Sequence, residues 1–252
     1  MNLNSIKKYI SILILSFLVL GCTSKAPVTN RSQMILISQS QELALGEKSY
    51  KDTLKKSKIV TNTKEATKVK EIGLKIAKVV NNNYQWEFNL IDNKAKNAFC
   101  LPGGKVAVYS GILEVAQNDS QLATVISHEI AHALARHGAE RMSSGMVSST
   151  LQMVGNVILG STGNSQYGNM FNLAYGAGSQ YGVLLPYGRL QESEADEIGL
   201  HLMYKAGFEI YEIKPVKNKQ TIAFKQKQII EAKYIDMELK QINNKEAKAI
   251  YD

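Results

Sequence analysis

The chain has 252 residues, of which 44% are hydrophobic and 21% charged, an ordinary globular composition that allows one sizeable core. Its formal net charge is +8. No basic helix interleaved with aromatic residues and no nucleic-acid-binding motif accompanies that charge, so we expect no nucleic-acid partner. With only two cysteines, Cys22 and Cys100, the sequence implies no disulfide framework.

The first residues have the pattern of a secretory signal. Lys7 and Lys8 precede a nearly apolar run at 9–20, which is shorter than the roughly 20 residues that a membrane-spanning helix needs. The run ends in Leu-Val-Leu-Gly-Cys, which resembles the lipobox of bacterial lipoproteins. The resemblance implies a signal peptide at 1–21 and lipidation of Cys22; a plain signal peptide that ends near a cysteine is the alternative. Several acyl chains on Cys22 would anchor the protein stably to a membrane.

The residues that follow are expected to form a short tether at 22–37 and then two helices. Ser38 and Gln41 are typical of a capping box at the start of the first helix. The second helix is expected at about 63–80, because Val69, Ile72 and Ile76 recur at spacings of three and four.

Two short strands and a strong helix come next. Residues 84–90 alternate between apolar or aromatic and polar, which indicates a half-buried strand. A Pro-Gly-Gly turn at 102–104 leads into a second strand at 105–109. The helix is expected from about Ser120 to His137, with Gly138 as its natural stop.

Residues 143–188 are rich in Ser, Gly, Asn and Tyr. We interpret the apolar stretch at 151–159 as a core or groove-lining helix, since it is too short to span a bilayer. The Gly-rich part at about 160–182 is expected to be a loop. A further helix is expected from about Gln191 to Ala206, ended by Gly207.

The chemistry is carried by His128-Glu129-Ile130-Ala131-His132. Positions four apart share one helix face, so both imidazoles can reach one zinc ion. Glu129 lies about 100° round the helix from His128, near enough to address a water on the metal. Because zinc lowers the pKa of such a water to about 7, Glu129 can act as the general base. The alternative is a helix that carries two surface histidines.

A catalytic zinc needs a third protein ligand and an open fourth position. Glu192 is the best candidate, and Asp196, four residues on, can accept a hydrogen bond from a ligand histidine. His137 is rotated about 140° from His132, and His201 about 180° from Glu192, so neither is expected to be a ligand. Glu194 is expected to face solvent.

These motifs resemble the gluzincin metallopeptidases of the CAAX prenyl protease and HtpX-like family. H-E-x-x-H is followed some sixty residues later by Glu192-x-x-x-Asp196, and residues 97–111 and 185–189 are similar to further signatures of that family. The resemblance covers about 33–212 and is nearest to the lipid-anchored periplasmic branch of the BepA and LoiP type. It implies an α+β, mainly helical fold, in which a zincin-like metalloprotease domain has a small β-sheet beside the H-E-x-x-H helix. It also implies one Zn²⁺ per subunit.

In such enzymes an exposed strand edge beside the cleft pairs with the backbone of the substrate. That edge is expected at Lys105, Val106, Ala107, Val108 and Tyr109, although a purely structural strand is the alternative. The implied function is hydrolysis of unfolded or misassembled envelope proteins. Thr23, rather than Asp, follows Cys22, which by resemblance to Gram-negative sorting favours an outer-membrane lipoprotein facing the periplasm.

The family pattern extends through 38–212, the expected peptidase domain, and fades in a Lys-rich tail at 213–252. A frameshift near codon 213 or divergence of the branch would explain the tail. The competing hypothesis is therefore a non-catalytic lipoprotein, a chaperone or assembly factor with a latent or inactivated zinc site.

Overall fold

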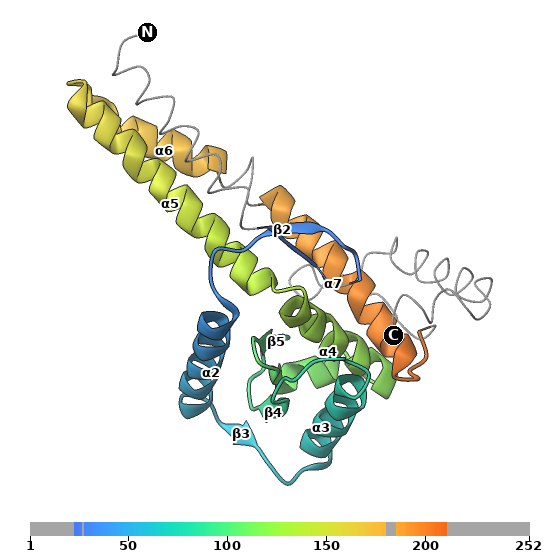
Figure 1. The fold of residues 1–252 in the computed structure, drawn as a ribbon. Helices are drawn as coiled ribbons and strands as arrows, with labels where there is room; N and C mark the ends of the chain where they lie inside the picture. The colour runs from blue at the N-terminus through green and yellow to red at the C-terminus, as the bar shows by residue number, and fades with distance from the viewer. Residues whose placement is uncertain (1–22, 27, 180–184, 211–252) are drawn as a thin grey trace. The chain divides into compact units, whose positions relative to one another are not determined.

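The computed structural model describes residues 23–26, 28–179 and 185–210 (Figure 1). The expected signal peptide, Cys22 and the tail at 213–252 lie outside these residues. The main helices are α2 (Gln39–Lys55), α3 (Lys64–Ala77), α4 (Asp119–Leu134), α5 (His137–Ser161), α6 (Gly168–Ser179) and α7 (Leu185–Lys205). The strands are β1 (Thr23–Lys25), β2 (Ser32–Met34), β3 (Ile59–Val60), β4 (Glu87–Ile91), β5 (Ala98–Leu101) and β6 (Lys105–Tyr109). Two short 3₁₀ turns are η1 (Ser110–Glu114) and η2 (Ser165–Tyr167).

The expected fold class is confirmed, because helices predominate and the described strands form one four-stranded and one two-stranded sheet. The helix starts follow from local capping. The Ser38 hydroxyl accepts a hydrogen bond from the backbone N–H of Gln41 at 3.2 Å, and Oε1 of Gln41 accepts one from the backbone N–H of Ser38 at 3.0 Å. Thr63 caps α3 by accepting from Ala66 N at 3.2 Å.

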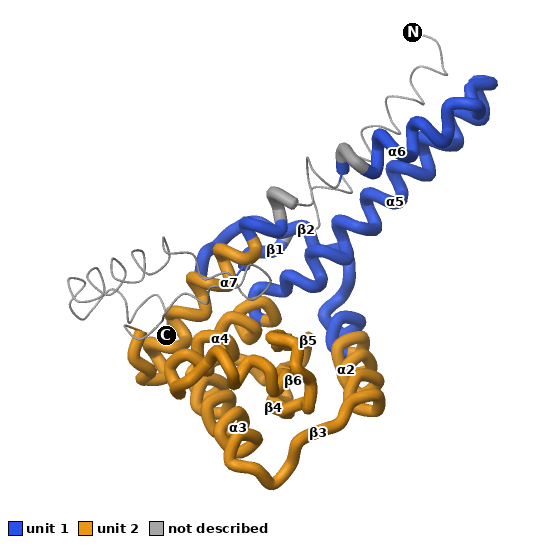
Figure 2. The backbone as a smooth tube through the Cα atoms, turned by 180° about the vertical axis from the view of Figure 1, so that it is seen from behind, with its two compact units in different colours: residues 1–43, 134–190 blue, residues 44–133, 191–252 orange. Residues whose placement is uncertain are grey.

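The chain divides into two compact units, 1–43 with 134–190 and 44–133 with 191–252 (Figure 2). The second unit holds a four-stranded sheet in the order β3-β4-β6-β5. β6 runs parallel to β4 and antiparallel to β5. Helix α2 is fixed to this sheet by the buried Tyr50, whose hydroxyl donates to Val106 O at 2.8 Å and accepts from Asn89 Nδ2 at 2.9 Å.

The strand order corrects one expectation. Lys105, Val106, Ala107, Val108 and Tyr109 form β6 as expected, but β6 has a partner strand on each side along its whole length. Its backbone N–H and C=O groups are therefore already used within the sheet. The prediction that this strand is an exposed edge is wrong, and the edge on that side of the sheet is β5.

The first unit begins with an antiparallel hairpin of β1 and β2, in the segment expected as a tether. Arg31 just before β2 donates two hydrogen bonds of 2.8 Å to the carboxylate of Glu140, which is fully buried in the first turn of α5. The Leu36 N–H donates to the Ser143 hydroxyl at 2.8 Å. The N-terminal segment is thus bonded to the start of α5.

The junction between α4 and α5 also differs from expectation. Helix α4 ends at Leu134, and Arg136 takes the left-handed conformation with φ of 55°, so Gly138 lies inside α5 and is not the stop. The strained φ of a non-glycine residue is held by tertiary bonding. The Nε–H of Arg136 donates to Glu42 Oε2 at 2.7 Å. Sequence reasoning could not find this stop, because its partner is distant along the chain.

The segment expected as a loop, at about 160–182, contains a helix, because α6 covers Gly168–Ser179. Helices α5 and α6 form a hairpin, and the Gly-rich stretch contributes most of α6. Within the described residues, no helix combines the length and the apolar character that crossing a membrane requires.

Candidate metal centre

The site lies in the second unit, where α4 and α7 carry the residues that the sequence singled out. Close approach of the two helices is possible because Gly199 of α7 has no side chain. A Cβ placed there would lie 3.1 Å from the backbone N of His128 and 3.2 Å from its Cα. The buried Ala195 and Ile198 complete the apolar contact surface of α7. The sequence pattern does not single out this glycine, although a glycine inside a helical pattern commonly has a packing reason.

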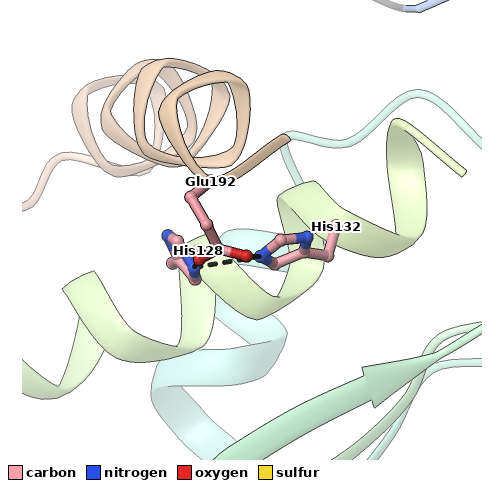
Figure 3. A group of neighbouring side chains, drawn as sticks. All are labelled: His128, His132 and Glu192. Atoms are coloured by element: carbon pink, nitrogen blue, oxygen red, sulfur yellow. Dashed lines mark hydrogen bonds and ion pairs between the residues drawn. The ribbon is translucent and has the colours of Figure 1, made fainter. Parts of the chain in front are cut away.

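Three side chains converge between these helices (Figure 3). His128 and His132 project from successive turns of α4, and Glu192 reaches them from α7. The two Nε2 atoms are 3.1 Å apart. Oxygens of Glu192 lie 3.4 Å from Nε2 of His128 and 3.5 Å from Nε2 of His132.

These distances fit a zinc ion. Zinc binds imidazole nitrogen and carboxylate oxygen at about 2.0–2.2 Å in tetrahedral geometry, which places neighbouring ligand atoms about 3.4 Å apart. The two Nε2 atoms are 3.1 Å apart, Oε2 of Glu192 approaches His128 to 3.4 Å and Oε1 approaches His132 to 3.5 Å, and one ligand atom from each residue lies within 4.8 Å of the other two. The side chain of Glu192 is 56% exposed, so three protein ligands leave the site accessible for a fourth, as in catalytic zinc sites.

Asp196 fixes the orientation of His128. Its Oδ1 lies 2.8 Å from Nδ1 of His128, and both residues are buried. When Nδ1 carries the proton and donates it to the carboxylate, the lone pair of Nε2 points into the cluster. Asp196 and Glu192 are four residues apart on α7, so one helix face supplies both the carboxylate of the cluster and the carboxylate behind it.

The charges of the cluster affect one another strongly. Burial alone lowers the pKa of His128, but hydrogen bonds to Asp196 and Glu192 and the nearby charge of Glu129 outweigh it and raise that pKa to about 10. Hydrogen bonds from His128 and then His132 hold the pKa of Glu192 far below its ordinary value. Burial raises the pKa of Asp196, and the bond from His128 opposes that rise. A proton therefore stays on His128 when no metal competes for it.

Glu129 is half-buried on α4 and lies near strand β5. Desolvation and then the negative charge of Glu129 raise the pKa of the Cys100 thiol on β5. The charge of Glu129 is thus felt at the edge strand of the sheet. Sequence reasoning placed Glu129 correctly on the helix but could not connect it with β5.

The other candidates near the site take different positions. His137 is fully buried in the first turn of α5, and His201 is half-buried on α7. Neither belongs to the group of possible ligands found among the described residues. Glu194 is buried, so the expectation that it faces solvent is wrong. The helical repeat predicts that Glu194 points away from Glu192, but it does not predict whether that side of α7 is exposed to solvent or packed against another segment.

Comparison with known proteins agrees with this geometry. The profile described as Peptidase family M48 matches residues 63–224. The mitochondrial metalloendopeptidase OMA1 of Saccharomyces cerevisiae is 33% identical over 229 residues, which cover 85% of this chain and 63% of that protein. The beta-barrel assembly-enhancing protease of Escherichia coli K12 is 28% identical over 176 residues, covering 69% of this chain and 36% of that protein. The human mitochondrial OMA1 metalloendopeptidase is 28% identical over 193 residues, covering 72% and 36%.

The chain spans less than two thirds of the length of each of these relatives. They include mitochondrial and bacterial proteins, so they support the recognised peptidase family without establishing a bacterial lipoprotein branch. Because the family profile matches more than half of the residues, the chain belongs to peptidase family M48, whose members are zinc-dependent metallopeptidases.

Proposed function

We propose that this chain is a zinc metalloendopeptidase that hydrolyses unfolded or misassembled proteins of the bacterial envelope. The observation that carries the proposal is the convergence of His128, His132 and Glu192, whose ligand atoms lie within 4.8 Å of one another, in a chain of family M48. A structural zinc site would present four protein ligands, whereas this cluster offers three and stays accessible at Glu192.

His128, His132 and Glu192 would hold one zinc ion. When bound, the ion would act as a Lewis acid that polarises the peptide carbonyl and makes water acidic enough to lose a proton near neutral pH. Asp196 keeps His128 in the tautomer that directs Nε2 inward. Glu129 accepts a proton from the attacking water and donates it to the amine that leaves.

The substrate backbone would pair with β5. Tyr109 N donates to Asn97 O at 3.0 Å, and the register pairs Phe99 with Ala107. In an antiparallel ladder, hydrogen-bonded residue pairs such as Asn97–Tyr109 and Phe99–Ala107 alternate with pairs that form no hydrogen bonds to each other, here Ala98–Val108 and Cys100–Val106. The backbone groups of Ala98 and Cys100 therefore point away from β6, toward the edge, and Cys100 is the residue near Glu129.

The proposed substrate class follows from this mode of recognition. Main-chain pairing with an edge strand selects extended chains and reads little side-chain sequence, which suits cleavage of unfolded proteins. One relative is named as a protease that enhances β-barrel assembly, which supports a role in the envelope. The lipobox-like residues ending at Cys22 support attachment to the outer membrane, facing the periplasm.

The test compares cleavage of a casein-type unfolded substrate by the wild-type chain and by Glu129→Gln, with the zinc content of both measured. We expect zinc in both proteins and a loss of activity of about 10²–10⁴-fold in the variant. Equal cleavage by the two proteins would refute the proposed role of Glu129. Zinc binding without turnover in the wild type would favour the chaperone hypothesis, and His128→Ala serves as the metal-binding control.

The edge strand is tested separately with Cys100→Pro against Cys100→Ala. Proline removes the N–H that points outward, which edge strands tolerate, whereas alanine removes only the thiol. We expect a raised KM for Cys100→Pro and a nearly unchanged KM for Cys100→Ala. Phe99→Pro, which removes an N–H directed at β6, should instead lower the unfolding temperature. Equal KM values for the two Cys100 variants would rule β5 out as the substrate strand.

A further inference from the structure

The hairpin of α5 and α6 differs in composition from the rest of the chain. Between Arg141 and Arg189 the sequence contains no Asp, Glu, Lys or Arg, although 21% of the whole chain is charged. Both helices belong to the first unit, and they run side by side (Figures 1 and 2). A helix on a water-exposed surface normally carries its charges on the outer face, so the composition alone is unusual for one.

Three amide side chains and a tyrosine hydroxyl of the hairpin form hydrogen bonds between the two helices. Gln152 Nε2 and Asn156 Nδ2 of α5 both donate to Asn172 Oδ1 of α6, at 3.0 and 2.9 Å. The hydroxyl of Tyr175 donates to the carbonyl of Ser148 at 2.9 Å. The ring of Phe171 fills the space at Gly155, where a Cβ would lie 2.3 Å from the ring. Amide side chains and a small residue therefore join the helices, as between helices in membranes.

Many large apolar side chains of both helices lie on the outer surface. Val157 is 65% exposed on α5, and Leu173 is 77% exposed on α6. Other exposed apolar residues of the two helices are Met146, Leu151, Met153, Val154, Ile158 and Met170. At 100° per residue, the direction of each side chain round the axis of α5 can be measured from that of Gln152. Asn156 then lies at about 40°, whereas the exposed apolar residues Met153, Val154, Val157 and Ile158 lie between about 100° and 240°, on the opposite face. The hairpin is thus inverted relative to a helix pair that faces water.

We propose that the outer face of the α5–α6 hairpin inserts into a lipid bilayer. An apolar solvent favours side chains that point outward and penalises charges, and this surface meets both conditions over both helices. Because no described helix is long and apolar enough to cross a membrane, the hairpin lies at interfacial depth and does not span. The function of the hairpin is separate from peptide hydrolysis and does not depend on the proposed substrate.

Lipid fits this surface better than a second copy of the chain. Protein interfaces surround an apolar centre with a polar and charged rim, and residues 142–188 offer no charge for such a rim. The hairpin is also bonded to the N-terminal end of the described chain. Leu36 N donates to Ser143 of α5, and β1 begins at Thr23, directly after the proposed lipidation site. An acyl chain on Cys22 would therefore anchor the same compact unit that carries the hairpin.

Depth-sensitive fluorescence on the full chain tests the insertion. An NBD label is placed on Val157→Cys, Leu173→Cys or the control Leu74→Cys, an exposed apolar position on α3. All three are made in a Cys100→Ser background, and the unsubstituted background supplies the blank for any label on Cys22. The protein is added to vesicles of phosphatidylethanolamine and phosphatidylglycerol, with or without bromine on the acyl chains. We expect bromine to quench the labels at 157 and 173 at least several-fold more than the label at 74.

A matched pair of substitutions then separates lipid from protein partners. In a Cys22→Ser background, which removes the proposed lipid anchor, Val157→Lys should lower vesicle binding about tenfold, while Val157→Thr, of similar shape and uncharged, should change it little. Both variants are checked for zinc content and helical signal. Equal quenching at 157, 173 and 74 would overturn the proposal. A dimer in solution that Val157→Lys dissociates, without quenching by lipid, would overturn it in favour of a second copy.

Discussion

Replacing Asp196 with Asn tests how far the residue behind the cluster controls the metal. The substitution keeps the shape of the side chain but removes its charge. His128 and Asp196 are both buried and 2.8 Å apart, so the bond between them is charge-assisted and little screened by water. Such a bond contributes about 1.5–3 kcal/mol, against about 0.5–1.5 kcal/mol for a neutral one.

The difference of about 1.4 kcal/mol corresponds to a tenfold weaker affinity for zinc, and loss of the fixed tautomer could extend the effect toward a hundredfold. Competition of the protein with a chelator of known affinity measures it. Glu197→Gln, an exposed carboxylate on the same helix, is the matched control and should bind zinc as the wild type does. If the zinc dissociation constant of Asp196→Asn lay within twofold of the values for the wild type and for Glu197→Gln, Asp196 would not control the metal affinity. The unfolding temperature of Asp196→Asn is measured to show that the variant is folded.

Three further predictions follow from particular contacts. Gly199→Ala should weaken zinc binding, because the added Cβ would lie 3.1 Å from the backbone of His128. Gly188→Ala on the same helix is the control, since its Cβ would meet nothing within 4 Å and the affinity for zinc should stay unchanged. The chelator assay compares the two variants. Arg31→Met should cost about 3 kcal/mol of unfolding free energy in urea, since it leaves the buried carboxylate of Glu140 without its cation, and adding Glu140→Gln should restore part of the loss. In metal-free protein the pKa of His128 is about 10, above its ordinary 6.5, so protonated His128 stabilises the fold below pH 6.5 and that contribution is lost as the pH rises to 10. The unfolding temperature in EDTA should therefore fall between pH 7 and pH 10, and a flat profile would contradict this assignment.

Expectations that rest on local spacing agree with the structure. The caps at Ser38 and Thr63 involve residues three positions apart, and the metal cluster combines two i, i+4 pairs, one on α4 and one on α7. A helix repeats every 3.6 residues whatever its surroundings, so such spacings fix which side chains share a face. The zinc motif also lies in a helix that its apolar periodicity predicts independently.

Expectations that needed a distant partner failed. The family resemblance predicts an edge strand at Lys105–Tyr109, but hydrogen bonding to both β4 and β5 puts this strand inside the sheet. Sequence spacing does not say which strands flank it. The end of α4 was placed at Gly138, but the side chain of Glu42 lets Arg136 end the helix earlier. Burial of Glu194 likewise depends on what packs round α7.

By itself the sequence singled out the candidate metal ligands, because the identity and helical spacing of His128, His132, Glu192 and Asp196 match a zinc-binding pattern. Only the tertiary structure decided which strand lies at the edge of the sheet and which way the α5–α6 hairpin turns its apolar side. Strand order and the direction of a helix face are set by contacts between segments far apart in the chain, and no local pattern encodes them.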